Sequence, residues 1–315
     1  MQEAHSNKYP NDSDYEIDFR EIFYILLKGK WIIVSVTGFI SIIGVIYSLQ
    51  LSNIYESKAL LVPVDSSGSI SGALQSYSGL AGLAGINLPS GVDKGNSAKA
   101  IEKIGSLSFF KNSILTNIYL PDLMAVESWD LNTNTLSYDE SIYKKNSSTW
   151  VREYSYPKQK IPSAQESFAV FKSEHLKIIE DKDSSFISLS IKHQSPFIAK
   201  QWAELVVKEI NNFYRQKDKS ESQKAVSYLN QQISMTSLSE VKQVIAQLLQ
   251  EETQKLTLIE ANKFYVFEYI DPPVVSEKKS DPKRSIICIL SALIGGMLSI
   301  ILVLSKHYFF KKKAA

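Results

Sequence analysis

Two long runs without a charged residue, one near each end of the chain, most strongly restrict what this sequence can fold into. They extend over residues 31–51 and 285–304. A helix needs about 20 apolar residues to cross the hydrocarbon core of a membrane, and both runs have that length. Neither run alternates as the strands of a membrane barrel do. We therefore predict transmembrane helices at residues 31–51 and 285–305.

Basic residues around the two runs indicate how the chain is oriented. Lys28 and Lys30 precede the first run, and four lysines lie between positions 306 and 313 after the second. Because positively charged flanks stay in the cytoplasm, we predict a cytoplasmic segment at residues 1–30 and a cytoplasmic tail at residues 306–315. The first run follows an acidic stretch and precedes no small-residue cleavage site, which favours an uncleaved anchor over a signal peptide.

Residues 52–284 are then expected to form one large domain outside the cytoplasm, although Lys283 and Arg284 add positive charge on that side. The single cysteine, Cys288, lies in the second run, so the domain has no disulfide and must be stabilised by packing or assembly. The formal net charge of +2 excludes a strongly basic nucleic-acid-binding protein, and we expect no nucleic-acid partner.

Helix breakers are distributed unevenly in this domain. Glycine is absent from residues 106–294, and proline is absent from residues 197–271. So long a stretch, rich in Gln, Glu, Lys, Leu and Ala, favours helix. We predict a long helix over about residues 196–263, with the Ser195 hydroxyl as its N-cap and Pro196 at its first position.

Apolar residues recur at helical spacing along this predicted helix, interrupted by a polar patch at residues 217–224. The patch indicates either one bent helix or two helices in series. The spacing is too irregular for a clean heptad repeat. The apolar face must pack either on its own chain or on other copies, and we expect packing between copies. The candidate residues for this oligomer interface are Leu229, Ile233, Leu238, Val241, Ile245 and Leu248.

Strands are predicted on both sides of the long helix, at residues 54–64, 186–192 and 264–270, and a further helix at residues 98–119. The expected fold class is an α+β membrane protein. Its two transmembrane helices flank an α/β base domain, from which the long helix protrudes. Residues Gly68–Gly95 hold seven glycines but lack the Gly-Lys-Ser/Thr of a phosphate loop, so we interpret them as a flexible loop.

No catalytic constellation is recognisable in the sequence. The four histidines are scattered, and one cysteine cannot form a zinc site. Asp181 and Asp183 resemble the acidic pair of metal-dependent glycosyltransferases, but a solvated turn before a strand explains them better. We expect no enzymatic activity, no catalytic residue, no metal and no cofactor.

Small residues recur every four positions in the second apolar run, and the first run has a comparable face. This spacing allows two helices to approach closely. The candidate residues for packing of the transmembrane helices are Gly38, Gly44, Ser291, Gly295, Gly296 and Ser299.

Six short segments carry a family resemblance through their order along the chain. They are YEIDFREIF at 15–23, KGKW at 28–31, YESKALLVP at 55–63, SPFIAKQWA at 195–203, FEYIDPP at 267–273 and SDPKR at 280–284. Together with the two apolar runs, they resemble the polysaccharide co-polymerases, the Wzz-type chain-length determinants. The membrane-entry linker of this pattern comprises Pro272, Pro273, Pro282, Lys283 and Arg284. It departs from the family in having fewer prolines, since residues 276–279 are Ser-Glu-Lys-Lys.

The resemblance implies an inner-membrane protein of a Gram-negative bacterium with a periplasmic domain. It also implies a ring-like homo-oligomer that sets the modal length of lipopolysaccharide O-antigen made by a Wzy-type polymerase. The expected partners are further copies of the chain, the polymerase, a polysaccharide or lipid-linked glycan, and the membrane. No bond-making activity is implied.

Two other functions remain open from the sequence. The first is a co-polymerase for capsule or exopolysaccharide polymerisation and export. Since only ten residues follow Ser305, we expect no fused kinase domain, although a separate kinase partner fits. The second is a sensory receptor, for which residues 306–315 offer too short an output module.

Overall fold

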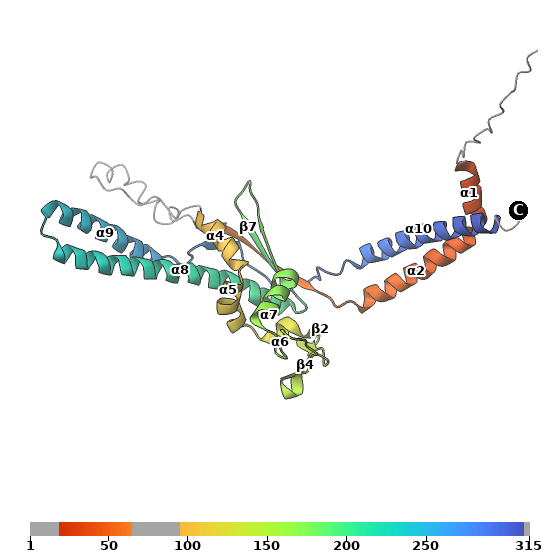
Figure 1. The fold of residues 1–315 in the computed structure, drawn as a ribbon, viewed down its shortest axis with the longest axis horizontal. Helices are drawn as coiled ribbons and strands as arrows, with labels where there is room; N and C mark the ends of the chain where they lie inside the picture. Colours follow the sequence, from red (N-terminus) through yellow and green to blue (C-terminus); the bar gives the residue numbers. More distant parts are fainter. Residues whose placement is uncertain (1–18, 65–94, 312–315) are drawn as a thin grey trace, which may run out of the picture. The chain divides into compact units, whose positions relative to one another are not determined.

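The computed structural model describes residues 19–64 and 95–311 (Figure 1). The chain divides into two compact units. One comprises residues 1–51 together with 282–315, and the other comprises residues 52–281. The expected glycine-rich loop lies, except for Gly95, outside the described residues.

The described part of the first unit contains three helices: α1 (Phe19–Lys28), α2 (Lys30–Gln50) and α10 (Arg284–Lys311). Helices α2 and α10 coincide with the two apolar runs and are long and apolar enough to cross a membrane. They pack against each other, while most of their large apolar side chains remain exposed on the outer surface of the pair. Such a surface is typical of helices surrounded by lipid.

The second unit is built on a four-stranded sheet with the order β6-β7-β1-β8. The strands are β1 (Tyr55–Pro63), β6 (Leu176–Glu180), β7 (Ile187–His193) and β8 (Phe267–Asp271), and every neighbouring pair is antiparallel. The three strands predicted from the sequence are confirmed within a few residues, whereas β6 was not predicted.

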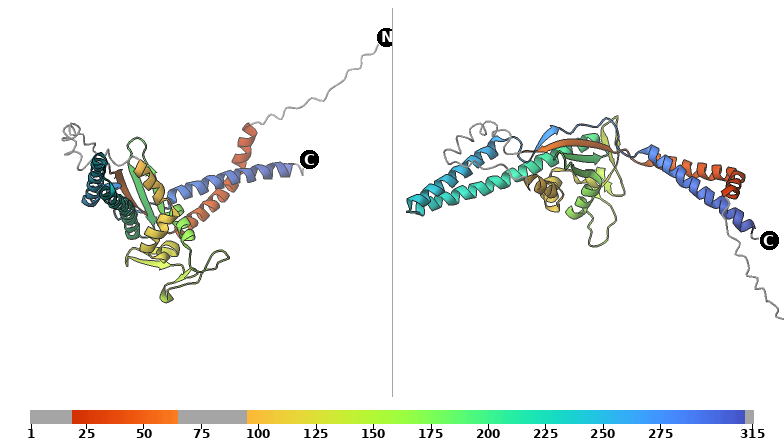
Figure 2. Two further views of the ribbon diagram at one scale, coloured as in Figure 1. Left: turned by 60° about the vertical axis from the view of Figure 1, so that its left-hand side comes forward. Right: turned by 90° about the horizontal axis from the view of Figure 1, so that it is seen from above.

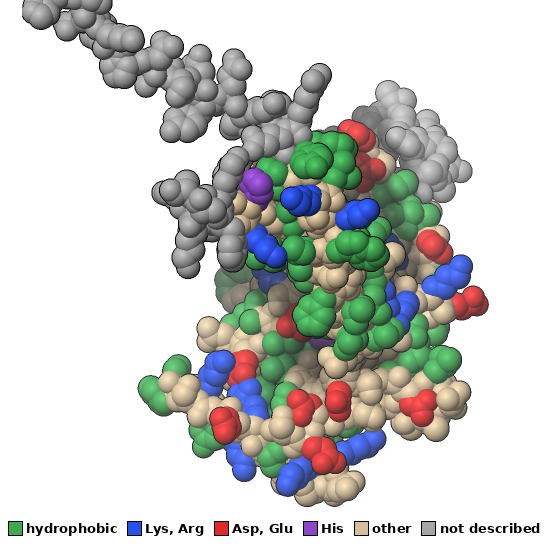
Figure 3. Space-filling view, turned by 90° about the vertical axis from the view of Figure 1, so that its right-hand side faces the viewer, with side chains coloured by type: hydrophobic (Ala, Val, Ile, Leu, Met, Phe, Trp, Pro, Cys, Tyr) green, Lys and Arg blue, Asp and Glu red, His purple; other side chains and the backbone are tan. Residues whose placement is uncertain are grey.

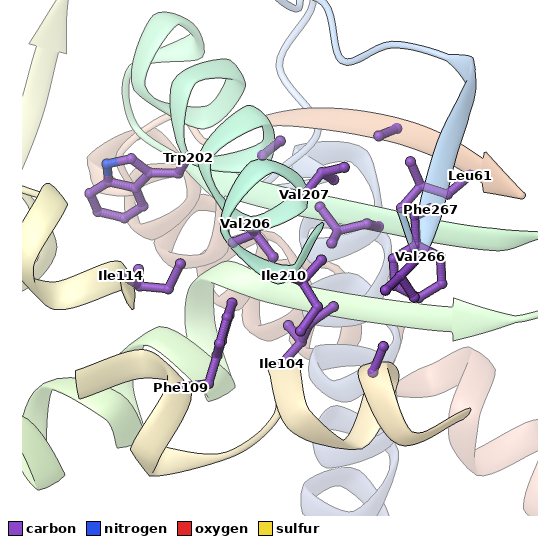
Figure 4. Packing of buried hydrophobic residues seen from close by; sticks show 14 of the residues in the cluster. Leu61, Ile104, Phe109, Ile114, Trp202, Val206, Val207, Ile210, Val266 and Phe267 are labelled. Carbon is purple, nitrogen blue, oxygen red and sulfur yellow. The ribbon is translucent and has the colours of Figure 1, made fainter. Parts of the chain in front are cut away.

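Alternation along β7 places Ile187, Leu189 and Ile191 in the core. Helix α8 (Pro196–Met235) covers this sheet and contributes apolar residues from its first turns (Figure 4). Figure 4 shows Trp202, Val206, Val207 and Ile210 of α8 in one cluster with Leu61 of β1 and Phe267 of β8, with Val207 nearer than Trp202 to these strand residues. The sheet and the first half of α8 therefore form one hydrophobic core.

Short helices complete the core next to α8. Helix α4 (Gly95–Ile104) and α5 (Leu107–Phe109) are followed by a π-helical turn at Phe110–Ile114 and a 3-10 turn at Leu115–Asn117. The single helix predicted at residues 98–119 is thus wrong in its continuity. It breaks at Gly105 and Ser106, where the Ser106 hydroxyl accepts a bond from the Phe109 N–H and caps the next helix.

Helix α8 is followed by α9 (Ser239–Ala261), and the two pack antiparallel as a helical hairpin (Figures 1 and 2). The break lies at residues 236–238, where Thr236 adopts an extended conformation. The alternative of two helices is confirmed, but the break does not lie in the polar patch at residues 217–224, which is continuous helix. The second helix also folds back on the first instead of extending it.

The remaining elements lie between residues 120 and 175, and the last of them contributes Phe171 to the main core. They are α6 (Leu120–Met124), β2 (Val126–Asp130) paired with β3 (Thr135–Tyr138), β4 (Tyr143–Lys144) paired with β5 (Thr149–Trp150), and α7 (Ala164–Val170) followed by a π-helical turn at Phe171–His175. Ala125, Tyr143 and Trp150 form the centre of a second, smaller core.

Candidate interaction surfaces

The contact between α2 and α10 is made by small residues. A Cβ atom added to Gly44 would lie 2.5 Å from the Ser291 Cβ, and one added to Gly295 would lie 3.2 Å from the Thr37 Cα. The Thr37 and Ser299 hydroxyls are 3.4 Å apart. Four of the six predicted packing residues, Gly44, Ser291, Gly295 and Ser299, therefore lie between the two helices, where small residues permit close approach.

The other two predicted packing residues face away from this contact. A Cβ atom added to Gly38 or Gly296 would meet nothing within 4 Å. That Gly38 and Gly296 pack against another chain remains a prediction. Gly29 is not among the predicted packing residues, yet a Cβ atom added there would lie 2.5 Å from the Val303 Cγ1. The sequence signal for Gly29 was weak, since it stands between two lysines outside the apolar run.

The segments that enter and leave the second unit are joined to each other. The Ile54 N–H donates to the Asp281 carbonyl at 3.0 Å, and the Ser280 N–H donates to the Ile54 carbonyl at 2.8 Å. The Lys192 ammonium binds the Asp281 carboxylate at 2.5 Å. These contacts hold both ends of the unit beside β7.

The predicted membrane-entry linker follows β8 and includes these contacts. Pro273 is buried, Pro272 and Lys283 are exposed, and Pro282 is half-buried. The Arg284 guanidinium donates to the Leu51 carbonyl at 3.5 Å within the first unit. Of the linker residues, Pro273 is therefore buried, Arg284 is hydrogen-bonded within the chain, and Lys283 is exposed.

The far end of the helical hairpin carries the predicted oligomer-interface residues. Leu238 is 63% exposed, and Val241 and Leu248 are also exposed. Ile245 is only 8% exposed, because it packs inside the hairpin, and Leu229 and Ile233 are half-buried. Exposed apolar residues that were not predicted lie nearby, at Tyr228, Met235 and Val244.

The base of the hairpin is fixed by a buried amide. Asn211 of α8 accepts three backbone N–H bonds through Oδ1, from Tyr265, Val266 and Phe267, at 3.1, 2.7 and 3.0 Å. Its Nδ2 donates to the Phe267 and Val207 carbonyls, both at 3.0 Å. One side chain therefore satisfies the backbone of the turn that connects α9 to β8.

Charged side chains of α8 also bind the end of α9 and the turn that follows it. Arg215 donates to the carbonyls of Asn262 and Lys263 at 2.8 and 2.7 Å. Lys219 forms an ion pair with Glu260, and the Tyr265 hydroxyl donates to Asp218. The polar patch at residues 217–224, predicted to bend or break the helix, therefore contacts the end of α9 and the turn after it.

Two of the histidines lie together in the core, contrary to their scattered positions in the sequence. The His175 and His193 rings are 5.7 Å apart, and both rings lie against Trp202. The Ser195 N–H donates to His193 Nδ1 at 2.9 Å, so Nε2 carries the proton and donates to the Asp122 carbonyl at 2.9 Å. Burial lowers the pKa of His193 to about 4 and lowers the pKa of His175.

The predicted cap of the long helix is only partly correct. Ser195 occupies the N-cap position and Pro196 the first helical position, as predicted. The Ser195 hydroxyl makes no capping bond, however, and its N–H is directed to His193 instead.

The acidic pair expected to form a solvated turn does so. Asp181 accepts bonds from the Asp183 N–H at 3.0 Å and the Ser184 hydroxyl at 2.7 Å, between β6 and β7. The Ser184 hydroxyl lowers the pKa of Asp181. Within residues 19–64 and 95–311, no three His, Cys, Asp or Glu side chains gather into a group that could hold a metal ion.

Residues 230–308 match the family described as a G-rich domain on putative tyrosine kinases, although this chain has only two glycines there. No curated protein matches the chain.

Two solved structures resemble the fold. A full-length bacterial polysaccharide co-polymerase is 16% identical, with a TM-score of 0.41, over 95% of this chain and 100% of that one. A fragment of the co-polymerase WzzB from Salmonella Typhimurium is 14% identical, with a TM-score of 0.31, over 73% of this chain and 100% of that one.

The second family match covers the N-terminal third of the chain. Residues 15–110 match the Wzz family, described as chain length determinant protein. This stretch contains the segments at 15–23, 28–31 and 55–63 that carried half of the sequence resemblance. The match confirms the resemblance to the Wzz-type chain length determinants over these residues.

Proposed function

We propose that this chain sets the modal length of lipopolysaccharide O-antigen, as a homo-oligomeric co-polymerase of a Wzy-type polymerase. The observation that carries the proposal is the match of residues 15–110 to the chain length determinant family. In this proposal α2 and α10 anchor the protein in a bacterial inner membrane, and residues 52–281 lie in the periplasm. The protein acts as a regulator rather than as an enzyme.

The physical basis of the proposal is a shared apolar surface. Leu238, Val241 and Leu248 are exposed at the far end of the hairpin. Burying exposed apolar area is the main favourable term in protein association, so several copies would pack through these residues. The resulting assembly would present its transmembrane helices to the polymerase and its periplasmic surface to the growing polymer.

The test is a lipopolysaccharide gel from an O-antigen-producing strain that lacks its own length determinant, with and without this gene. We expect a random ladder to become a discrete modal band when the protein is present in the membrane. An immunoblot of the membrane fraction establishes that the protein is made. An unchanged ladder with normal protein levels would contradict a role in O-antigen length.

A second function is favoured by the match of residues 230–308 to a domain described on putative tyrosine kinases. In that case the chain is a co-polymerase for capsule or exopolysaccharide, acting with a separate kinase. The neighbouring genes distinguish the two functions. An O-antigen cluster supports the first, and a capsule-export operon supports the second.

A further inference from the structure

Helix α1 has an amphipathic sequence that the proposed function does not use. The sequence of its ten residues, Phe19–Lys28, has Phe, Ile or Leu at positions 19, 22, 23, 25, 26 and 27. This is the spacing of one apolar face on a helix. At about 1.5 Å per residue α1 is roughly 15 Å long, which is too short to cross a membrane.

Only one edge of the apolar face of α1 packs on the rest of the unit. Ile25 is 5% exposed, and α1 lies against α10. Phe23 and Leu27 are each two residues from Ile25, which is about 200° around a helix and therefore nearly the opposite side. These two side chains are 65% and 52% exposed.

The exposed face of α1 is close to the apolar surface of α2. The two helices are separated only by Gly29, whose N–H donates to the Ile25 carbonyl at 2.9 Å. Figure 1 shows α1 turned across the end of the α2–α10 pair. Trp31 and Val34, at the start of α2, are exposed and continue the apolar surface.

Basic residues border the same surface. Lys28 and Lys30 stand on the two sides of Gly29, and both side chains are exposed. On the face that Figure 3 shows, hydrophobic and basic side chains lie next to one another. An apolar face bordered by lysines and an exposed tryptophan matches the boundary between acyl chains and lipid headgroups.

We propose that α1 lies flat in the membrane–water interface and binds anionic lipid. The apolar face, with Phe23 and Leu27, enters the acyl region, and Lys28 and Lys30 bind headgroup phosphates. This inference rests on the membrane location in the proposed function. Lipid fits better than a protein partner because the face is continuous with the exposed surface of a helix that itself fits a membrane.

The test uses the full-length protein in phospholipid vesicles. Since Cys288 is the only cysteine, Cys288→Ala gives a background without thiols. Single cysteines are introduced by Phe23→Cys and Leu27→Cys, and Lys28→Cys serves as the matched control on the same helix. Each is labelled with an environment-sensitive fluorophore and exposed in turn to a quencher attached to lipid chains and to an aqueous quencher.

We expect the labels at positions 23 and 27 to be quenched from the lipid and protected from the aqueous quencher. The label at position 28 should show the opposite behaviour. Equal access of the aqueous quencher to all three labels would overturn the proposal. Protection of positions 23 and 27 from both quenchers would also overturn it, since a protein partner would then cover the face.

A fourth label separates this inference from the proposed function. Ile43 is exposed in the middle of α2, so the label in Ile43→Cys should be quenched from the lipid whatever α1 does. If that label is not quenched from the lipid, the membrane location fails and the proposal fails with it. If it is quenched and positions 23 and 27 are not, only the proposal for α1 fails.

Vesicle composition tests the charge preference. Lipid quenching at position 23 should be stronger in vesicles of phosphatidylcholine with phosphatidylglycerol than in phosphatidylcholine alone. The combined change Lys28→Gln and Lys30→Gln should abolish that difference. Equal quenching in both vesicles before the change would overturn the anionic-lipid part of the proposal.

Discussion

At the scale of single residues, the Asn211 side chain holds the turn between α9 and β8 in place. Its amide satisfies three backbone donors and one carbonyl where α9 turns into β8, all of them buried. Asn211→Leu would leave these groups without partners, and each buried unsatisfied group costs about 1–3 kcal/mol. We expect the free energy of unfolding to fall by at least about 3 kcal/mol, because several buried groups lose their partners at once.

Denaturant titration of the purified full-length protein measures this loss. Gln216→Leu is the matched control, because Gln216 is an exposed residue of the same helix. The control should change stability by less than about 0.5 kcal/mol. Equal unfolding curves for the two variants would contradict the role assigned to Asn211.

The buried histidine pair predicts a dependence of stability on pH. His193 has a pKa of about 4 in the folded state against 6.5 for the free side chain. Between these values the unfolded state binds more protons, so stability falls as the pH is lowered from 6.5 towards 4. For His193 alone the loss at pH 5.5 is about 1 kcal/mol. His175, whose pKa is also lowered, acts in the same direction.

Thermal unfolding at pH 7.5, 6.5 and 5.5 measures this effect. His193→Gln lacks the titrating group, so its melting temperature should change less between pH 6.5 and 5.5 than that of the original protein. Parallel curves for the two proteins would assign the pH dependence to other groups.

Neither residue could be selected from the sequence. Asn211 sits within an apolar helical pattern, and its partners are 54 to 56 residues later. His175 and His193 become neighbours only because β6 pairs with β7. Periodicity reports which side of an element is buried, but it does not report which polar group meets another across the core.

At the scale of elements, the contact between α2 and α10 depends on the absence of side chains. Gly44→Val would place a Cβ 2.5 Å from the Ser291 Cβ, so the two helices must separate. Overpacking of this kind costs about 1–3 kcal/mol. Gly38→Val is the matched control in the same helix, because a Cβ there meets nothing within 4 Å.

A disulfide reports this separation. The combined change Thr37→Cys and Ser299→Cys, in the Cys288→Ala background, replaces two hydroxyls that are 3.4 Å apart. We expect efficient cross-linking within one chain, reduced by Gly44→Val and unchanged by Gly38→Val. Equal reduction by both valines would show that the contact does not distinguish the two faces of α2.

Apolar runs and alternating strands could be predicted, but the path of the chain between them could not. Both ends of α2 and the start of α10 were located to within one residue, whereas α10 continues to Lys311, beyond its predicted end at residue 305. The turn between α8 and α9 contains neither glycine nor proline, so residues 236–238 gave no breaker signal. The polar patch at residues 217–224 was interpreted as a break because its partners on the returning helix were unknown.

At the scale of the whole molecule, the exposed apolar end of the hairpin predicts self-association. Leu238→Gln, Val241→Gln and Leu248→Gln together remove apolar surface from exposed positions and leave the buried Ile245 in place. We expect the sedimentation coefficient of the detergent-solubilised protein to fall towards that of a single chain. The modal band in the lipopolysaccharide gel should broaden at the same time.

The control for this prediction changes three exposed polar residues of α9: Glu240→Gln, Gln243→Asn and Gln247→Asn. These changes should leave both the sedimentation coefficient and the gel pattern as they were. If the apolar variant sediments like the unchanged protein, the chains associate through another surface.

The order of the sheet has a consequence for how the protein is made. Strand β1, at residues 55–63, lies between β7 and β8, whose residues are 187–193 and 267–271. Ribosomes synthesise β1 early, yet its last partner emerges only when nearly the whole chain exists. Closing such long loops is slow, and an unpaired strand edge attracts other chains meanwhile. We therefore expect the sheet to close only after β8 has been synthesised, and chaperones that bind the nascent chain should raise the yield of folded protein.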